Sequence, residues 1–188
     1  MPRAAPPLGT ERLLLRAHRA GDLDARVMLY ADAEAMRFIG GVQNREECWA
    51  RIQRYAGHWA LLGYGMWAAE AREDGAFLGE LGLGRFERGL GSDFDDAIEV
   101  AWVLGARAHR RGLATEGMAA AIAWHEHACG PARLVAVIAH ENLASLRVAA
   151  KLGFAVYAER EYRGAARLLL ERLPRANGGY PEADHALG

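Results

Sequence analysis

The residues best suited to chemistry lie in a basic, glycine-containing stretch between an apolar run and a helical one. The stretch HRRGLATEGMAAAIAWH (109–125) follows AIEVAWVL (97–104), so a strand is expected to lead through a turn into a helix. A helix N-terminus presents backbone N–H groups without partners inside the helix, and its dipole favours an anion. Gly112 lets an oxygen atom approach the backbone closely, while Arg110 and Arg111 supply positive charge. The stretch therefore predicts an anion site for phosphate or pyrophosphate.

A plainer interpretation of this turn stays open, because strand-to-helix turns often contain glycine and the two arginines are equally suited to solvent. Two other phosphate motifs are absent from the chain. It has no G-x-x-x-x-G-K-[ST] sequence, and GELGLGRFE (79–87) offers glutamate where the dinucleotide fingerprint needs its third glycine. We therefore expect residues 79–87 to form a strand and a turn.

A second group of residues, HENLASLRVAAKLGF (140–154), has the pattern of a short, well-capped helix. Asn142 is placed to cap its start, and Gly153 stands where the chain leaves the last turn, with Phe154 available for the accompanying apolar contact. Ala144, Val148 and Leu152 repeat every four residues and form an apolar stripe. By itself, the pattern indicates a structural helix with a basic outer face.

The elements that must position these residues alternate between strand and helix patterns. A strand is expected at 12–17 and helices at 22–39 and 44–62, with Asp22 and Asn44 as N-caps. Three strands within 64–104 form an antiparallel meander, and the nearly all-apolar helix after Gly112 should be buried. A strand at 133–139, a helix at 143–152 and strands within 154–159 and 166–173 complete the chain. The order predicts an α/β (α+β) fold, a mixed sheet flanked by helices in one domain.

Composition and charge favour a cytoplasmic globular enzyme or binding protein over several other classes. The chain has 188 residues, 52% of them hydrophobic, and a net charge of −1, so no overall field attracts nucleic acid or an anionic membrane. The chain has only two cysteines, which indicates a reducing compartment. It shows neither the apolar core of a signal peptide nor an apolar run long enough to cross a bilayer, so we expect no membrane anchor. HEHAC (125–129) lacks four convergent ligands, so no metal site is expected.

The ends of the chain differ in composition from its middle. Residues 1–9 and 174–188 are rich in proline, glycine and polar residues, and we expect both segments to be flexible. The single domain then spans residues 10–173.

In their order and spacing, EVAWVL, HRRGLATEG and the later Asn142-x-x-Ser145 to Gly153-Phe154 segment resemble the GNAT superfamily of acyl-CoA-dependent N-acyltransferases. Within it, TERLLLR, DAEAMRFIGG, YGMW, FLGELGL and GLATE resemble the RimJ/RimL-type branch. No single motif is specific, but their order and spacing make the combination so. The resemblance covers residues 10–173.

The resemblance implies a GNAT-like mixed, splayed β-sheet flanked by helices, with acetyl-CoA as co-substrate lying in the split. The backbone of 109–114 would hold its pyrophosphate. The strand at 102–104 would pair with its pantetheine arm, which Asn142 and Ser145 of the later short helix would also contact. The family's loop pattern is [Q/R]-x-x-G-x-[G/A], from which His109 departs. The cofactor-binding residues implied in this way are Trp102, Val103, Leu104, His109, Arg110, Arg111, Gly112, Leu113, Ala114, Thr115, Asn142 and Ser145.

Acetyl transfer to an amine requires a base, because a free alkyl amine with a pKa of ~10 is mostly protonated at neutral pH. Glu99 lies on the predicted strand just before the cofactor-facing residues, on the opposite face from Ile98 and Val100. It is the leading candidate for the base; a solvent-facing strand residue is the alternative. A backbone N–H near Val103 could stabilise the developing oxyanion.

The proton donor for the leaving thiolate is less clearly indicated. Many superfamily members carry a tyrosine four residues before the glycine of the G-F pair, where this chain has Ala149. The RimL-type branch also lacks this tyrosine, and the resemblance implies Ser145 as donor, with Glu161 as an assisting carboxylate. In the plainer interpretation Ser145 only binds pantetheine and Glu161 faces solvent.

These observations predict an acetyl-CoA-dependent N-acetyltransferase that works by direct attack in a ternary complex. The acceptor would be a primary amine, on a protein N-terminus or a small molecule, and a homodimer is compatible with the sequence. Asp93, Asp95 and Asp96 make the loop 87–96 acidic, which favours a cationic acceptor. Two alternatives remain: a non-catalytic acyl-CoA-binding module, suggested by Ala149 and His109, and an unrelated phosphate-binding domain.

Overall fold

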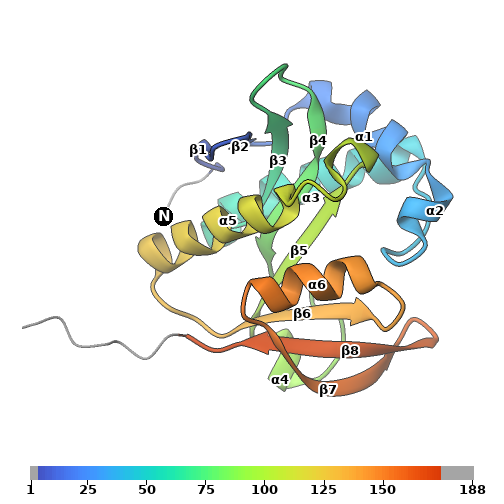
Figure 1. Ribbon diagram of the computed structural model, residues 1–188, viewed down its shortest axis with the longest axis vertical. Coiled ribbons are helices and arrows are strands. Elements are labelled where there is room, and N and C mark those ends of the chain that lie inside the picture. Colours follow the sequence, from blue (N-terminus) through green and yellow to red (C-terminus); the bar gives the residue numbers. More distant parts are fainter. Residues whose placement is uncertain (1–3, 175–188) are drawn as a thin grey trace, which may run out of the picture.

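An eight-stranded mixed sheet runs through the molecule, in the order β1-β2-β3-β4-β5-β6-β8-β7 (Figure 1). The computed structural model describes residues 4–174. The strands are β1 (Leu8–Gly9), β2 (Leu13–Arg16), β3 (Met66–Ala71), β4 (Phe77–Gly84), β5 (Ile98–Leu104), β6 (Leu134–Ala139), β7 (Ala155–Tyr162) and β8 (Ala165–Arg172). The helices are α1 (Leu23–Tyr30), α2 (Ala33–Met36), α3 (Arg45–Leu62), α4 (Ser92–Asp95), α5 (Leu113–Cys129) and α6 (Leu143–Lys151), with short 3-10 turns at Ala20–Asp22 and Ala106–Ala108.

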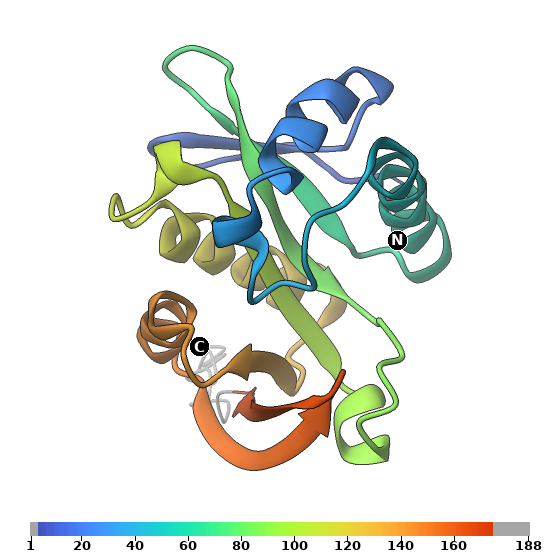
Figure 2. The ribbon, with the colours of Figure 1, turned by 90° about the vertical axis from the view of Figure 1, so that its right-hand side faces the viewer.

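The sheet is split between β5 and β6. Antiparallel pairing of β4 with β5 is continuous, whereas the parallel pairing of β5 with β6 is confined to Ile98 with Leu134 and Glu99 with Val135. Beyond these residues the two strands diverge, so β3 to β5 and β6 to β8 form two differently oriented halves (Figures 1 and 2). The predicted mixed, splayed sheet flanked by helices is therefore confirmed.

Helix α5 packs closely against one face of the sheet, as its small residues predict. A Cβ atom placed on Gly117 would lie 2.5 Å from Leu81 Cδ2 of β4 and 3.1 Å from Leu13 Cδ1 of β2. Only glycine permits this distance between helix and sheet. The close contact fixes the N-terminal end of α5 relative to β5, from which the basic turn departs.

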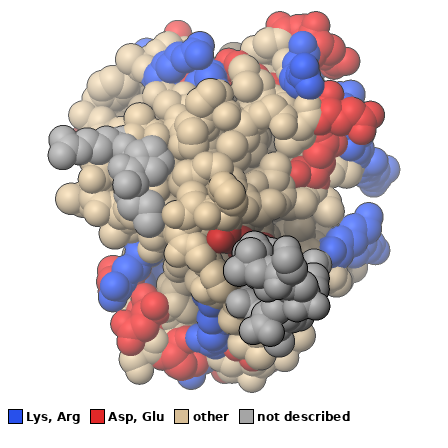
Figure 3. Space-filling view, turned by 90° about the vertical axis from the view of Figure 1, so that its left-hand side faces the viewer, with Lys and Arg blue, Asp and Glu red and all other residues tan. Residues whose placement is uncertain are grey.

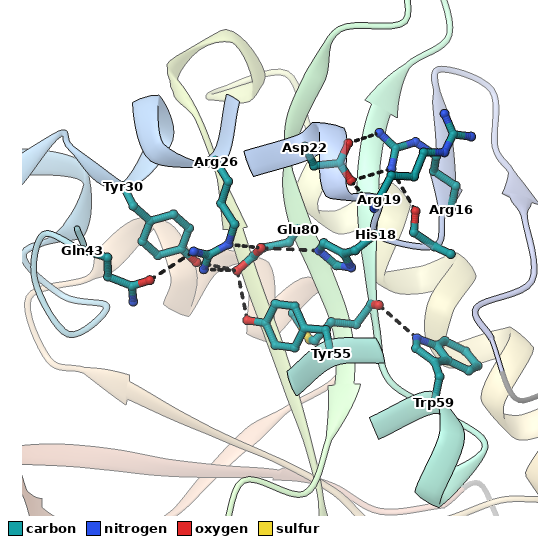
Figure 4. A network of polar contacts seen from close by, with 12 residues as sticks. Arg16, His18, Arg19, Asp22, Arg26, Tyr30, Gln43, Tyr55, Trp59 and Glu80 are labelled. Carbon is teal, nitrogen blue, oxygen red and sulfur yellow. Dashed lines mark hydrogen bonds and ion pairs between the residues drawn. The ribbon is translucent and has the colours of Figure 1, made fainter. Parts of the chain in front are cut away.

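The opposite face carries α1 and α3, which a buried polar network joins to β4 (Figure 4). Glu80 is fully buried and accepts hydrogen bonds from Arg26 Nε (3.1 Å), Tyr30 Oη (2.6 Å) and Tyr55 Oη (2.9 Å). Burial alone would raise the pKa of Glu80, but hydrogen bonds and positive charge from His18 and Arg26 hold it well below its usual range. The network ties two helices to one strand.

The caps predicted for two helices are confirmed, and a third differs. The Asn44 side chain accepts a hydrogen bond from the backbone N–H of Glu47 at the start of α3, and that of Asn142 from Ser145 in α6. Asp22 precedes α1, but its carboxylate binds Arg16 at 2.6 and 2.8 Å instead of capping the helix.

The prediction of one continuous helix over 22–39 is wrong, because the structure has two separate helices there, α1 and α2. Helix α1 ends at Tyr30, and the Asp32 carboxylate accepts a hydrogen bond from the backbone N–H of Glu34 in the first turn of α2. An aspartate in this position satisfies free backbone donors and so favours a new helix start. The chain then leaves α2 toward the split in the sheet (Figure 2).

The segment 1–9, predicted to be flexible, contains β1, whose Leu8 and Gly9 pair with Leu15 and Leu14 of β2. The carbonyl of Pro6 accepts a hydrogen bond from Trp67 Nε1 at 2.8 Å. A two-residue strand has too few residues to show a pattern in sequence. The predicted flexible tail 174–188 lies almost entirely outside the described residues.

The surface carries both signs of charge. On the face shown in Figure 3, acidic and basic side chains lie mainly toward the edges, an acidic one shows near the middle, and uncharged side chains fill much of the rest. Within residues 4–174, no helix combines the length and apolar character needed to cross a bilayer.

Candidate active site

A cavity of about 360 Å³ lies in the split between β5 and β6. Residues Glu99–Val103 form one wall and Ala136–Ala139 the other. Beyond the pair of Glu99 with Val135 the two strands are not paired with each other, so backbone groups of Val100–Val103 and Ala136–Ala139 line the cavity. An unpaired strand edge can bind an extended, amide-containing ligand through main-chain hydrogen bonds.

Three of the residues predicted for the pantetheine arm meet at this cavity. Asn142, Ser145 and Trp102 all line it, and Trp102 Nε1 donates a hydrogen bond to Ser145 Oγ at 3.3 Å. The Asn142 cap fixes the start of α6, which places the serine hydroxyl beside the strand. Val103 also lines the cavity, whereas Leu104 lies beyond it.

Glu99 lies in the cavity wall and is only 4% exposed, so the solvent-facing alternative is wrong. Its two carboxylate oxygens accept hydrogen bonds from Arg88 Nε and Nη2, both at 2.6 Å. Burial raises the pKa of Glu99 above its ordinary value of 4.5, and the Arg88 guanidinium opposes this shift. A carboxylate with a raised pKa is a stronger base than an exposed one.

Two further residues of the cavity, Arg88 and Tyr162, were not predicted from the sequence. Arg88 Nη1 donates a hydrogen bond to Tyr162 Oη at 3.0 Å, so one guanidinium holds both the carboxylate and the phenol. Asp95 accepts a hydrogen bond from the backbone N–H of Arg88 at 2.9 Å and fixes the loop that carries it. Arg88 and Tyr162 are far apart in sequence, and only the sheet order brings them together.

The structure does not bring Glu161 to the cavity. Glu161 is exposed on β7, next to Tyr162, which does line the cavity. Successive strand residues point to opposite faces, so the carboxylate expected to assist Ser145 lies on the other side of the strand. Ala149, which replaces the usual tyrosine, is fully buried in the main core.

The basic turn lies beyond the end of β5 and outside the cavity wall. Gly112 adopts φ +77° at the start of α5, and His109 Nε2 forms a 2.9 Å hydrogen bond with the Leu104 carbonyl. Arg110 and Arg111 are exposed, whereas the nearby Glu116 carboxylate is bound by Arg12. The turn thus combines free backbone donors, an accessible glycine and positive charge, which fits a pyrophosphate.

The remaining predicted cofactor residues follow the turn into α5. Leu113 is buried and anchors the helix, while Ala114 and Thr115 are half-buried. None of the three lines the cavity, so their expected contribution is through the backbone at the helix start.

The acidic loop 87–96 does not offer free carboxylates to a cationic acceptor. Asp93 pairs with Arg160 at 2.7 Å, and Asp95 accepts backbone hydrogen bonds from Arg88 and Leu90. Asp96 contacts Arg85 at 3.4 Å, so all three aspartates already have partners within the protein and give little support to a cationic acceptor.

Comparison with known proteins agrees with this geometry. Residues 12–155 match the family model described as "Acetyltransferase (GNAT) domain". The chain is 26% identical over 151 residues to the uncharacterized N-acetyltransferase YoaA of Bacillus subtilis, covering 79% of this chain and 82% of that protein. A structure of a protein from Bordetella pertussis, named as a GnaT-family acetyltransferase, shares 34% identity with a TM-score of 0.80, over 89% of this chain and 99% of that one.

A RimL ribosomal L7/L12 alpha-N-protein acetyltransferase, solved in complex with coenzyme A, has a TM-score of 0.71 at 17% identity, over 90% of this chain and 98% of that one. That similarity concerns the fold alone. The family match covers most of the domain, so the chain belongs to the GNAT acetyltransferases. It is an acetyltransferase enzyme, which excludes the unrelated phosphate-binding domain as a description of the chain.

Proposed function

We propose that this enzyme transfers an acetyl group from acetyl-CoA to a primary amine by direct attack in a ternary complex. The observation that carries the proposal is the cavity between the unpaired edges of β5 and β6, with buried Glu99 in its wall. Bound acetyl-CoA would supply an activated acetyl thioester. The RimJ/RimL-type resemblance and a cytoplasmic location remain predictions.

The residues present fit this co-substrate along its length. The turn 109–115 would hold the pyrophosphate through backbone N–H groups, with Arg110 and Arg111 beside it. Asn142, Ser145 and the edge of β5 at Trp102 and Val103 would hold the pantetheine arm.

Glu99 would accept the proton of the attacking amine, directly or through water. The two hydrogen bonds from Arg88 fix its orientation, and its raised pKa brings its basicity nearer to the working pH. A backbone N–H near Val103 would stabilise the oxyanion, and no charged side chain is needed for this.

The Ser145 hydroxyl would give its proton to the leaving sulfur and take another from water, while Glu99 releases the proton of the amine to water. Its position at the cavity, with the hydrogen bond from Trp102 Nε1 to its oxygen, leaves its own hydrogen free to be donated inward. Glu161 lies on the other face of its strand, so we assign it no part in this step. Holding both substrates in register supplies the rest of the acceleration.

Release of free thiol from acetyl-CoA, measured over a panel of amines and peptides, tests the proposal. We expect amine-dependent release and a higher melting temperature with CoA than with ADP. Acetyl-CoA binding without thiol release for any amine would contradict the catalytic proposal. Equal protection by CoA and ADP would contradict the assignment of the pantetheine site.

A further inference from the structure

The charges around the cavity are strongly unequal. Four guanidinium groups line it, and Glu99 is the one carboxylate among its described lining residues. These guanidinium groups belong to Arg37, Arg88, Arg163 and Arg167. Since Arg88 is already bound to Glu99, this pair contributes no net charge, and any net positive charge of the cavity comes from the other arginines.

Two of these arginines have no carboxylate partner within residues 4–174. Arg167 Nη1 donates a hydrogen bond only to the Ala166 carbonyl at 3.0 Å, and the Arg163 guanidinium lies over the Tyr162 ring at 5.2 Å. Arg37, by contrast, pairs with Glu34 at the surface. The donors of Arg163 and Arg167 are therefore available to a ligand.

The two unpaired arginines are built into one side of the cavity. Arg163 occupies the tight turn between β7 and β8, at φ +53°, and reaches segment 37–41, where a Cβ on Gly40 would lie 2.9 Å from its Nη1 atom. Arg167 pairs in register with Ala139 at the end of β6, another lining residue. The hairpin and the segment after α2 thus close the cavity with positive charge.

The phosphates of acetyl-CoA do not account for this charge. The turn 109–115, which fits the pyrophosphate, lies outside the cavity wall, and the pantetheine arm is uncharged. The 3′-phosphate is attached to the ribose, on the far side of the pyrophosphate from the thioester. The anion that Arg163 and Arg167 are placed to bind therefore belongs to the second substrate.

We propose that the acceptor is a small amine that also carries a carboxylate, as an amino acid does. Arg163 and Arg167 would bind its carboxylate, because guanidinium groups pair with carboxylates through two parallel hydrogen bonds. Glu99 would receive the proton of its amine. The cavity of about 360 Å³ is near the lower end for ligand sites and must also hold the end of the pantetheine arm, so the space that is left suits a small acceptor. This inference rests on the proposed acetyl transfer.

Thiol release with each amino acid and with its carboxamide tests the inference in the complete enzyme. The α-amine of an amide has a pKa of ~8 and is more often neutral, so amine protonation alone would favour the amide. We expect the reverse, a kcat/KM at least about tenfold higher for the free acid, because the amide leaves the arginines unpaired.

The variants R163N and R167Q, alone and combined, test the residues. Asparagine suits the left-handed backbone of position 163, so the turn should fold. In the double variant we expect the preference for the acid to shrink to roughly threefold or less, through a higher acceptor KM and an unchanged KM for acetyl-CoA. R45Q removes an exposed arginine away from the cavity and should keep the preference.

The outcomes distinguish failure of the inferred acceptor class from failure of the proposed acetyl transfer. An enzyme that acetylates acids and amides equally well overturns the inference and leaves the acetyl transfer intact, as does a double variant in which only the KM for acetyl-CoA rises. Thiol release with peptides but with no amino acid also overturns it. An enzyme that releases no thiol with any amine overturns the proposed function and the inference together.

Discussion

Arg88 and Glu99 meet through two parallel hydrogen bonds of 2.6 Å in the wall of the cavity. The pair joins the loop before α4 to the strand at which the sheet divides. The carboxylate is almost fully buried, whereas the arginine side chain keeps 22% of its surface exposed. Although Arg88 and Glu99 form one contact, replacing each of them should therefore affect activity differently.

Glu99→Gln should abolish most activity while retaining the shape of the side chain. We expect kcat to fall by about 100-fold or more, the range for loss of a general base, with acetyl-CoA protection in thermal melting unchanged. E159Q, on exposed β7, is the matched control. A kcat within about threefold of the wild type would exclude Glu99 as the base.

Arg88→Gln should shift the pH dependence of activity rather than abolish activity. Glu99 must be ionised to act, so wild-type activity should fall as the pH drops through its pKa, which lies above 4.5. Without Arg88, burial acts unopposed, the pKa rises further, and the acidic limb moves to higher pH. R85Q removes a neighbouring exposed arginine and should leave the limb in place. An unshifted limb in R88Q would contradict the opposing role of Arg88.

Ser145→Ala separates proton donation from binding. If the hydroxyl protonates the leaving sulfur, kcat should fall by roughly 10- to 100-fold with little change in the KM for acetyl-CoA. W102F, which removes the hydrogen bond to Ser145 but keeps the hydroxyl, should be milder. A rise in the KM for acetyl-CoA alone would show that Ser145 only binds the co-substrate.

Glu80→Gln should destabilise the fold because Arg26 would remain buried without its counter-charge. The expected loss is about 3 to 5 kcal/mol of unfolding free energy, measured by urea denaturation. The folded pKa of Glu80 is depressed, so its stabilisation is present above its unfolded value of about 4.5 and is lost as the pH falls below it. E80Q should remove this part of the acid sensitivity. Y55F, which loses one neutral donor, should cost only about 1 kcal/mol.

The sequence predicts those parts of the site that depend on local chemistry. Gly112 before an apolar helix, Asn142 at a helix start and Glu99 on a strand face each follow from patterns of a few residues, and each has the expected local position. The broad fold is predictable for the same reason, since the strands and helices have distinct periodicities.

The rest of the site depends on topology and could not be predicted. Tyr162 reaches Arg88 because β8 inserts between β6 and β7, an order that no local pattern encodes. In the sequence, Asp95 is part of an acidic loop that suggests a site for a cation. In the structure, its carboxylate accepts hydrogen bonds from backbone N–H groups of the same loop. The break after α1 depends on a single aspartate within an otherwise helical pattern.

The short parallel contact between β5 and β6 leaves two strand edges inside the molecule, instead of at its rim. Backbone amides along Val100–Leu104 and Ala136–Ala139 that face the split can exchange their hydrogens with water without unfolding of the sheet. A ligand that spans the gap would act as a missing strand and close both edges at once. Slower amide exchange confined to these segments would then record occupancy of the split independently of any reaction.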